Sequence, residues 1–249
     1  MPVMPPLRPH EPLTQFYAGW DSQAATVREL FDSSAPYYDR ICAAMSFGTG
    51  WRYRRDTLRR AGLKPGMRVL DVATGTGLVL AAALAEGVVR DALVGLDPSR
   101  RMLDVNRMRY GQPLVQGRGE ALPFADASFD LVSMGYALRH VEDLRALFAE
   151  CRRVLRPGGR LLILEITRPR SSPLRVLLGA YLGVVVPALA FLTSGRREPR
   201  RLMQYYWATI AACVSTEVIL AALAEARFAT PKLHVQGAIL TEYLAQKPI

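Results

Sequence analysis

A strand-like apolar segment that runs into a turn of small residues is the first part of this chain that could do chemistry. Residues 69–77 read Val-Leu-Asp-Val-Ala-Thr-Gly-Thr-Gly, and Gly75 and Gly77 let a ligand approach the backbone and the first amides of the next helix. Asp97 stands 20 residues after Gly77, at the end of the following apolar segment. A carboxylate at that point accepts both hydroxyls of a ribose. These features together predict a site for an adenosine-containing cofactor.

The residues around the turn distinguish two cofactors that share this arrangement. A dinucleotide site needs Gly or Ala three residues beyond Gly77, where the helix packs beneath a pyrophosphate, and this chain has Leu80. Asp71, on the preceding strand, instead offers a carboxylate to an ammonium group such as the one at the methionine end of S-adenosylmethionine. We therefore predict S-adenosylmethionine as the cofactor, and no metal site.

The elements that must hold these residues follow from the periodicity of the apolar side chains. From Met67 on, short apolar segments alternate with amphipathic stretches, which predicts a doubly wound sheet of mostly parallel strands. Three short helices should precede the sheet, between residues 24 and 63. We expect strands at 68–72, 93–96, 114–116, 130–134 and 160–166, a helix at 144–155 that ends at Arg156-Pro157-Gly158-Gly159, and two strands within 231–246.

Several segments resemble one family of enzymes. They are Phe-Asp-Ser-Ser-Ala-Pro-Tyr-Tyr-Asp at 31–39, Met-Ser-Phe-Gly at 45–48, the strand and turn at 69–77, Glu-Ala-Leu-Pro-Phe at 120–124, Leu-Arg at 138–139 and Leu-Arg-Pro-Gly-Gly at 155–159. With them the chain resembles class I S-adenosylmethionine-dependent methyltransferases and is, more narrowly, similar to the ubiquinone/menaquinone biosynthesis C-methyltransferase family. The resemblance implies a seven-stranded, Rossmann-like α/β fold with an N-terminal helical cap at 24–65 and a helical lid insertion at 170–212.

The same resemblance implies roles for single residues. Asp71, Gly75 and Gly77 would line the methionine moiety, Asp97 would hold the ribose, Met102 would cover the adenine and Tyr38 would close over the cofactor carboxylate. Arg118 stands where many relatives have Asp or Asn, and arginine cannot accept a hydrogen bond from the adenine amine, so we expect the backbone of Gly119 to serve instead. The predicted cofactor-binding residues are Tyr38, Asp71, Ala73, Gly75, Gly77, Asp97, Met102, Gly119 and Glu120.

His140 and Arg139 are the candidates for catalysis. A base that removes a phenol proton makes the ring carbon nucleophilic, and His140 follows the predicted fourth strand at a position where the family has Asn. The other interpretation is that His140 only begins the next helix. Arg139 would lower the pKa of the phenol or orient its oxygen, or else form a surface ion pair with Glu142 or Asp143.

Glu165 ends the fifth predicted strand, at the edge of the sheet where ligands bind in open α/β folds. Its carboxylate either faces the substrate or pairs with an arginine such as Arg139 or Arg168. Both interpretations stay open at this point.

Residues 174–192 are apolar apart from Arg175, and the segment approaches the length of a membrane-spanning helix. Arginines stand on both sides of it, whereas a spanning helix has its positive excess on one side. We therefore expect a lid over the active site that dips into the lipid interface; the alternative is burial against a second subunit or within the domain. The flanking arginines are Arg168, Arg170, Arg196, Arg197, Arg200 and Arg201, and the run Arg52, Arg54, Arg55, Arg59 and Arg60 would strengthen the attraction.

Length and composition suit one folded domain. The chain has 249 residues, of which 50% are apolar and 22% are charged, and this excludes disordered, collagen-like and coiled-coil proteins. Residues 1–23 are predicted to be a flexible tail, since the first twelve hold five prolines, and residues 24–249 to be the methyltransferase domain. Cys42, Cys151 and Cys213 are too far apart in sequence for a disulfide framework, which favours the cytoplasm. The net charge of +10 favours anionic partners.

The sequence thus predicts a methyltransferase that acts on a ring carbon of a lipophilic quinol or related phenol. The alternatives are an O- or N-methyltransferase of a small aromatic metabolite, and a cofactor-binding relative with a non-methylating or accessory role in quinone modification. Nucleic acid is not an expected partner, because Ser133-Met134-Gly135-Tyr136 replaces the Asn/Asp-Pro-Pro-aromatic turn and Cys151 lies in a predicted helix. We expect a cytoplasmic protein at the inner face of the membrane, with an anionic membrane surface and a second copy of the chain as partners.

Overall fold

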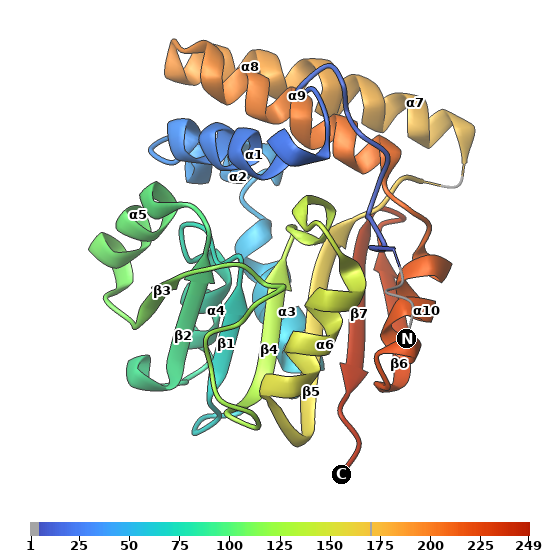
Figure 1. Cartoon of the computed structure of the whole chain (residues 1–249). Helices are drawn as coiled ribbons and strands as arrows, with labels where there is room; N and C mark the ends of the chain where they lie inside the picture. The colour runs from blue at the N-terminus through green and yellow to red at the C-terminus, as the bar shows by residue number, and fades with distance from the viewer. Residues whose placement is uncertain (1–4, 170) are drawn as a thin grey trace.

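A computed structural model describes residues 5–169 and 171–249 of the chain. A seven-stranded sheet has the order β3-β2-β1-β4-β5-β7-β6, with β7 antiparallel to both of its neighbours and the first five strands parallel (Figure 1). The predicted fold class and all seven predicted strands are confirmed. The strands are β1 (Val69–Val72), β2 (Leu93–Asp97), β3 (Leu114–Gln116), β4 (Phe129–Gly135), β5 (Leu155–Ile166), β6 (Ala229–Gln236) and β7 (Leu240–Gln246).

Helices cover both faces of this sheet because its strands are apolar on both sides. Successive side chains of a strand point to opposite faces, so Leu70 packs toward α6 (Leu144–Val154) and α10 (Thr216–Glu225), and Val69 packs toward α3 (Gly50–Arg60) and α4 (Leu78–Ala85). Cys151 lies buried in the first of these two cores, in the predicted helix. The remaining elements next to the sheet are α5 (Arg100–Tyr110) and the 3-10 turns η1 (Arg90–Ala92) and η2 (Leu138–His140).

A separate layer of helices lies across the carboxyl ends of the parallel strands, at the top of Figure 1. Its members from the start of the chain, α1 and α2, share one apolar core with its members from residues 172–212; Leu30 and Ile41 lie in the same cluster as Leu182 and Tyr206. The predicted cap and lid are therefore one structure. The layer consists of α1 (Trp20–Ser34), α2 (Tyr38–Met45), α7 (Ser172–Ala180), the π-helical turn η3 (Tyr181–Val185), α8 (Val186–Ser194) and α9 (Arg197–Ala212).

The three predicted N-terminal helices are present, but the third does not belong to the cap. Leu58 of α3 is fully buried against Leu80 of α4, on the face of the sheet. Its arginines also differ from the predicted membrane-facing row: Arg55 and Arg59 pair with Glu86, at 2.6 and 2.7 Å. Arg60 pairs with Glu242, and the Nε of Arg54 is buried. Most of these arginines are therefore ion-paired or turned inward and do not form a membrane-facing row.

The prediction of a flexible tail over residues 1–23 is wrong for residues 5–23; residues 1–4 lie outside the described part. The backbone of Leu7 donates to Asp143 and accepts from Leu144, and Pro9 accepts from the amide of Val214. His10 and Tyr17 are buried, at 3% and 4% exposed. The prolines do not prevent this packing, since an extended strap leaves few amides to satisfy and proline removes some of them.

Candidate functional site

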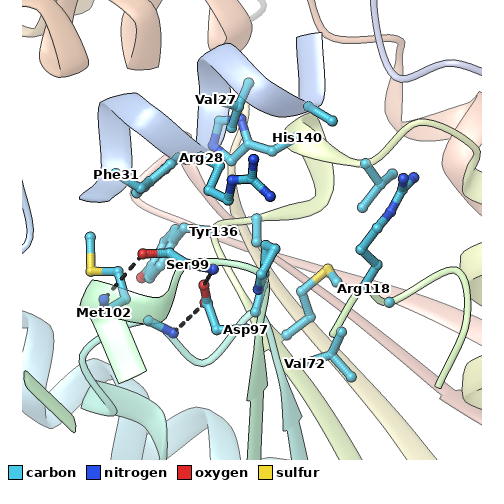
Figure 2. A pocket seen from close by; sticks show the side chains of 18 of the residues that line it. Val27, Arg28, Phe31, Val72, Asp97, Ser99, Met102, Arg118, Tyr136 and His140 are labelled. Atoms are coloured by element: carbon cyan, nitrogen blue, oxygen red, sulfur yellow. Dashed lines mark hydrogen bonds between the residues drawn. The ribbon is translucent and has the colours of Figure 1, made fainter. Parts of the chain in front are cut away.

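One cavity lies between the carboxyl ends of the strands and helix α1. Side chains of α1, among them Val27 and Phe31, form its roof, and Asp97 and Met102 lie on the opposite side (Figure 2). Of the predicted site residues, Tyr38, Ala73, Gly75, Asp97, Met102, Gly119, Glu120 and His140 line this cavity.

The turn after β1 is held in a conformation that leaves room for a ligand. Ala73, Gly75 and Gly77 all have positive φ, at 54°, 53° and 88°, which favours small residues. A Cβ on Gly75 would meet no atom within 4 Å, so the cavity reaches this backbone. A Cβ on Gly77 would stand 2.5 Å from the side chain of Asn106, and Gly77 is not among the lining residues. Gly77 therefore serves the packing of α5, and its predicted contact with the cofactor is not found.

Asp97 sits at the end of β2 with both carboxylate oxygens held by backbone amides. Oδ2 accepts from Gly75 and Oδ1 accepts from Ser99, each at 2.8 Å, as the dashed lines in Figure 2 show. Each oxygen keeps a second lone pair, which is free for a hydroxyl of a ribose. Burial raises the pKa of Asp97 to about 6, against the lowering effect of those two amides.

Asp71 precedes Val72, which lines the cavity. The side chain of Asp71 lies on the face of β1 toward α3 and α4 and does not itself line the cavity. Its Oδ1 accepts from the hydroxyl of Ser133 on β4 at 2.7 Å. Its Oδ2 is buried and has no hydrogen-bond partner among the described residues. Burial raises the pKa of Asp71 to about 7, because a charged carboxylate is costly in this environment. A cationic ligand would stabilise the charged form.

Arg54 of α3 is a charged group near this end of the site that the sequence analysis did not assign to it. Its guanidinium carbon lies 5.3 Å from the ring centre of Tyr136, and its Nε is buried with no hydrogen-bond partner among the described residues. Arg54 opposes the rise in the pKa values of Asp71, Tyr38 and Tyr136, which places its positive charge close to all three. Only the long arginine run 52–60 could have drawn attention to it, and in that run a buried arginine looks like a surface one.

Two aspartates fasten the helical layer onto the cavity. Asp32 of α1 accepts from the hydroxyl of Ser99 and the amide of Arg101, at 2.5 and 3.2 Å. Asp39 of α2 accepts from the hydroxyl of Thr76 in the turn after β1, and also pairs with Arg109. Both aspartates belong to the segment at 31–39, so this segment holds α1 and α2 above the turns at the ends of β1 and β2.

The far side of the cavity, after β3, is built from a small residue and a charge network. A Cβ on Gly119 would stand 2.6 Å from Leu147 and 3.0 Å from Val72, so this lining position requires glycine. Glu120 accepts from the amide of Glu142 at 2.7 Å. Arg118 pairs with Glu142 at 2.7 Å and also lies 3.7 Å from Glu120, which neutralises it. Arg118 therefore ties two loops together. The expected recognition of adenine by the backbone of Gly119 stays a prediction.

His140 presents a neutral imidazole to the cavity. Its ring lies between Phe31, at 5.3 Å and edge-on, and Tyr205, stacked at 5.4 Å. Nδ1 is 3.3 Å from the hydroxyl of Tyr205, and Nε2 has no partner among the described residues. Burial, and then the charge of Arg139, keep the pKa of His140 well below its usual range. The ring is therefore uncharged at neutral pH and its unpartnered nitrogen faces the cavity, while burial makes it a weaker base than an exposed imidazole.

Arg139 does not line the cavity, so its predicted contact with the acceptor is not found. It is fully buried, donates to Glu165 at 2.9 Å and to the hydroxyl of Thr209 at 2.7 Å, and lies 4.4 Å from the ring centre of Tyr206. Neighbouring residues in the turn η2 point in different directions, so His140 enters the cavity and Arg139 enters the interface between the sheet and α9. Of the two interpretations of Glu165, the ion pair with an arginine is the one observed.

Several further lining residues were missed by the sequence analysis, and three of them bear on the chemistry of the site. Tyr136 follows β4 with a φ of 62°, a strained conformation for a bulky residue and one that often marks a functional site. Phe31 and Arg28 reach the cavity from α1 (Figure 2). The position of Tyr136 after the fourth strand was a usable signal, whereas nothing local distinguishes Arg28 from other surface arginines. The insertion at 170–212 contributes no lining residue in its described part; it packs against α1 and α2 in the helical layer.

The residues present fit S-adenosylmethionine. The open space beside Gly75 accepts a ligand against the backbone, and the unpartnered Oδ2 of Asp71 suits an ammonium group. The unpartnered Nε of Arg54 supplies the opposite charge for a carboxylate. Neither Asp71 nor Arg54 lines the cavity itself, but each lies beside a lining residue, Val72 and Tyr136, and carries a charge opposite to one of those of an amino acid. Asp97 lines the cavity and suits a ribose.

Comparison with known proteins gives one family, and its enzymes use the cofactor that the site fits. The model of the ubiE/COQ5 methyltransferase family matches residues 20–231. The chain is 38% identical over 178 residues to a demethylmenaquinone methyltransferase from Renibacterium salmoninarum, a match that covers 71% of this chain and 74% of the relative. It is 31% identical over 233 residues to the ubiquinone/menaquinone biosynthesis C-methyltransferase UbiE from Geotalea uraniireducens, covering 89% and 96%.

Among solved structures, the chain is similar to a SAM-dependent methyltransferase from Thermotoga maritima. The TM-score is 0.63 at 19% identity, and the match covers 89% of this chain and 99% of that one. At this identity the likeness concerns the fold, which is that of the predicted class.

Proposed function

The chain belongs to the ubiE/COQ5 methyltransferase family and is an S-adenosylmethionine-dependent methyltransferase; on this basis we propose that it methylates a ring carbon of a lipophilic quinol or a related phenol. Relatives that are 31–38% identical carry names from menaquinone and ubiquinone biosynthesis. We extend that substrate class to this chain. We propose that the protein acts in the cytoplasm, at the inner face of the membrane.

One observation carries the proposal. A single cavity connects the part of the site near Asp97 and Gly75 with the free Nε2 of His140. Between them the walls are mainly apolar or aromatic, with Val27, Phe31 and Tyr136 in contact with the space. An aromatic ring that enters from the side of α1 would lie between His140 and the cofactor, with water excluded.

The residues of the chain divide into two groups in this proposal. Asp97 binds the ribose, Asp71 and Arg54 hold the two charges of the amino-acid end, and Tyr38 closes over that end from α2. When bound, the cofactor supplies an electrophilic methyl group on a positively charged sulfur. The small residues Ala73 and Gly119 let it lie close to the backbone.

His140 prepares the acceptor. The phenol O–H proton moves to Nε2, so the ring carbon beside the oxygen becomes nucleophilic. That carbon would form the new carbon–carbon bond to the methyl group as the methyl–sulfur bond breaks, with the electron pair of the broken bond left on a neutral sulfur. The ring becomes aromatic again when the proton on that carbon leaves and the oxygen takes its proton back from His140, which releases one proton overall. Arg28, an exposed residue of α1 that lines the cavity, adds positive charge, which favours the phenolate.

We expect His140→Ala and His140→Asn to lower kcat by about 10²- to 10⁴-fold, because His140 is the base assigned to the acceptor and both variants remove its unpartnered ring nitrogen. Labelled S-adenosylmethionine and a short-chain demethylquinol give the rate, and calorimetry gives the affinity for the cofactor, which should stay within about threefold because His140 lies at the acceptor end. His234→Asn, on exposed β6, is the matched control. Near-normal turnover of both His140 variants would show that the base assignment is wrong.

The same reaction separates the kinds of acceptor. Label on a ring carbon supports the proposal, and label on oxygen or nitrogen would indicate methylation of a heteroatom in a small aromatic molecule. Binding of the cofactor with no transfer to any of the phenols would contradict the proposed substrate class.

A further inference from the structure

An apolar stripe lies on the outside of the helical layer, along α7, η3 and α8. The side chains of Val176, Leu177, Val184 and Leu192 are 66–75% exposed and recur at the spacing of one helix face. Phe47, at the tip of the loop after α2, is 80% exposed and stacks on Tyr181 at 6.0 Å, which widens the stripe. A contiguous apolar face of this kind marks an interaction surface.

This helix, Ser172–Leu192, has the length and hydropathy of a membrane span, but its packing keeps it on the surface of the layer. The chain reverses at Gly195, whose φ is 65°, and α9 runs back along the same helix (Figure 1). Trp207 of α9 lies so close that a Cβ on Gly179 or Gly183 would come within 3.0 or 2.9 Å of its ring. Farther along, α9 supports His140 and Arg139, so both ends of the helical hairpin stay attached to the sheet.

Positive charge lies next to the stripe. Arg197, Arg200 and Arg201 line a groove with Phe191 and Trp207, and all three arginines are exposed. No carboxylate pairs with them among residues 5–169 and 171–249, although Glu198 is on the same helix. Phe191 belongs to both the stripe and the groove, so the apolar and the cationic surfaces are continuous.

Charge argues against a second copy of the chain on this face. Arg168 is exposed before the helix and the three arginines follow it, so both of its ends are basic. A parallel or an antiparallel pairing of two such helices would bring basic clusters together, in a protein whose net charge is already +10. An anionic bilayer, in contrast, offers apolar chains to the stripe and negative headgroups to the arginines.

We propose that this face docks on the surface of an anionic phospholipid bilayer, with the stripe of α7–α8 in the interface and the arginines of α9 on the headgroups. This proposal rests on the proposed function: a lipophilic quinol is dissolved in the bilayer, so docking would bring the enzyme to its acceptor. The docking face belongs to the same layer as α1, which roofs the cavity, so the acceptor travels only a short way to the site.

Flotation with vesicles tests the docking. The protein should float with phosphatidylcholine vesicles that contain phosphatidylglycerol, much less with phosphatidylcholine alone, and less as salt is added. The double variant Arg197→Gln/Arg200→Gln should lose about fivefold in partition for each arginine. Arg90→Gln/Arg107→Gln removes the same charge from exposed positions elsewhere and should bind close to normally.

A second pair of variants tests the stripe. Val184→Ser/Leu192→Ser should lower partition by about tenfold, whereas Val89→Ser/Met108→Ser, at exposed positions outside the stripe, should not. Flotation that is absent, or reduced equally by the control pairs, would overturn the proposal; so would a stable dimer that Val184→Ser/Leu192→Ser dissociates. Methyl transfer to a water-soluble short-chain quinol separates the two hypotheses: if it fails while flotation persists, only the proposed function is wrong.

Discussion

Asp71 and Asp97 hold their protons to a higher pH than ordinary aspartates, with pKa values of about 7 and about 6. Burial is the main cause for both. In the unfolded chain such groups lose their protons near pH 4, so between pH 4 and 7 the folded protein binds more protons than the unfolded chain. The stability of the protein without ligand should therefore fall as the pH rises through this interval.

Binding of the cofactor reverses that preference, because a positive ligand favours the charged carboxylate. We expect affinity for S-adenosylmethionine to rise between pH 6 and pH 8, by up to about tenfold per unit below the pKa of Asp71, with release of protons. Calorimetry at pH 6.5 in buffers of different ionisation enthalpy measures this release. Asp71→Asn should bind weakly and release fewer protons, and Asp104→Asn, on the outer face of α5, should behave normally.

The proton release of Asp71→Asn also provides the result that would contradict this assignment. If Asp71→Asn releases as many protons as the unchanged protein, the titrating group is another one, and Asp71 is not the partner of the ammonium group.

At the scale of elements, the helical hairpin depends on two small positions. The close contact of Trp207 with Gly179 and Gly183 leaves no room for a side chain. Pro187 near the start of α8 lacks an amide proton, and the π-helical turn Tyr181–Val185 just before it accommodates the interrupted hydrogen bonding. The straight course of this apolar helix along α9 follows from both features.

Gly183→Val should therefore destabilise the protein by about 1–3 kcal/mol through overpacking against Trp207. Denaturant unfolding followed by circular dichroism measures the change. Ala188→Val adds two of the same three carbon atoms at an exposed position of the same helix and should cost less than about 0.5 kcal/mol. Equal stability of the two variants would mean that the hairpin is more loosely packed than described.

The strands were predictable from the sequence because their signals are local. Apolar runs bounded by turn residues gave β1 to β4 within about a residue or two. β5 begins earlier, at Leu155 rather than Arg160, since Leu155 pairs with Phe129 before the register shifts. The packing of the cap against the lid was not predictable, because no local sequence pattern indicates that α1 packs against α9.

At the scale of the whole molecule, residues 5–19 act as a strap across the sheet and the helical layer. They bind α6 through Leu7, the segment between α9 and α10 through Pro9, and η2 through His10, whose Nε2 lies 3.0 Å from the carbonyl of Arg139. The strap thus stabilises the turn that carries His140.

Deletion of residues 1–12 should lower the free energy of unfolding by about 1–3 kcal/mol, as several hydrogen bonds of about 1 kcal/mol each are lost and the entropy of ordering the strap is regained. His10→Ala alone is the smaller perturbation, since it removes one of these contacts. Thermal unfolding followed by circular dichroism gives both values. A truncated protein as stable as the full chain would mean that the strap is not part of the fold.

The site could be predicted in part for the same reason as the fold. Gly75 and Asp97 follow strands directly, so their place at the carboxyl edge was fixed by the sheet. Arg139 was placed wrongly because its neighbour His140 faces the cavity, and a short turn sends adjacent side chains apart. Arg54 was hidden since its role depends on the burial of one side of α3, which no feature of the arginine run reveals.

The common core of α1, α2 and residues 172–212 also bears on how the chain folds during synthesis. The N-terminal helices leave the ribosome first, yet the partners that cover Leu30 and Ile41 are made only after all five parallel strands. The apolar faces of α1 and α2 therefore remain exposed to solvent until most of the chain has been synthesised. Completion of the roof over the cavity is therefore a late, long-range step, slower than the local pairing of the strands beneath it.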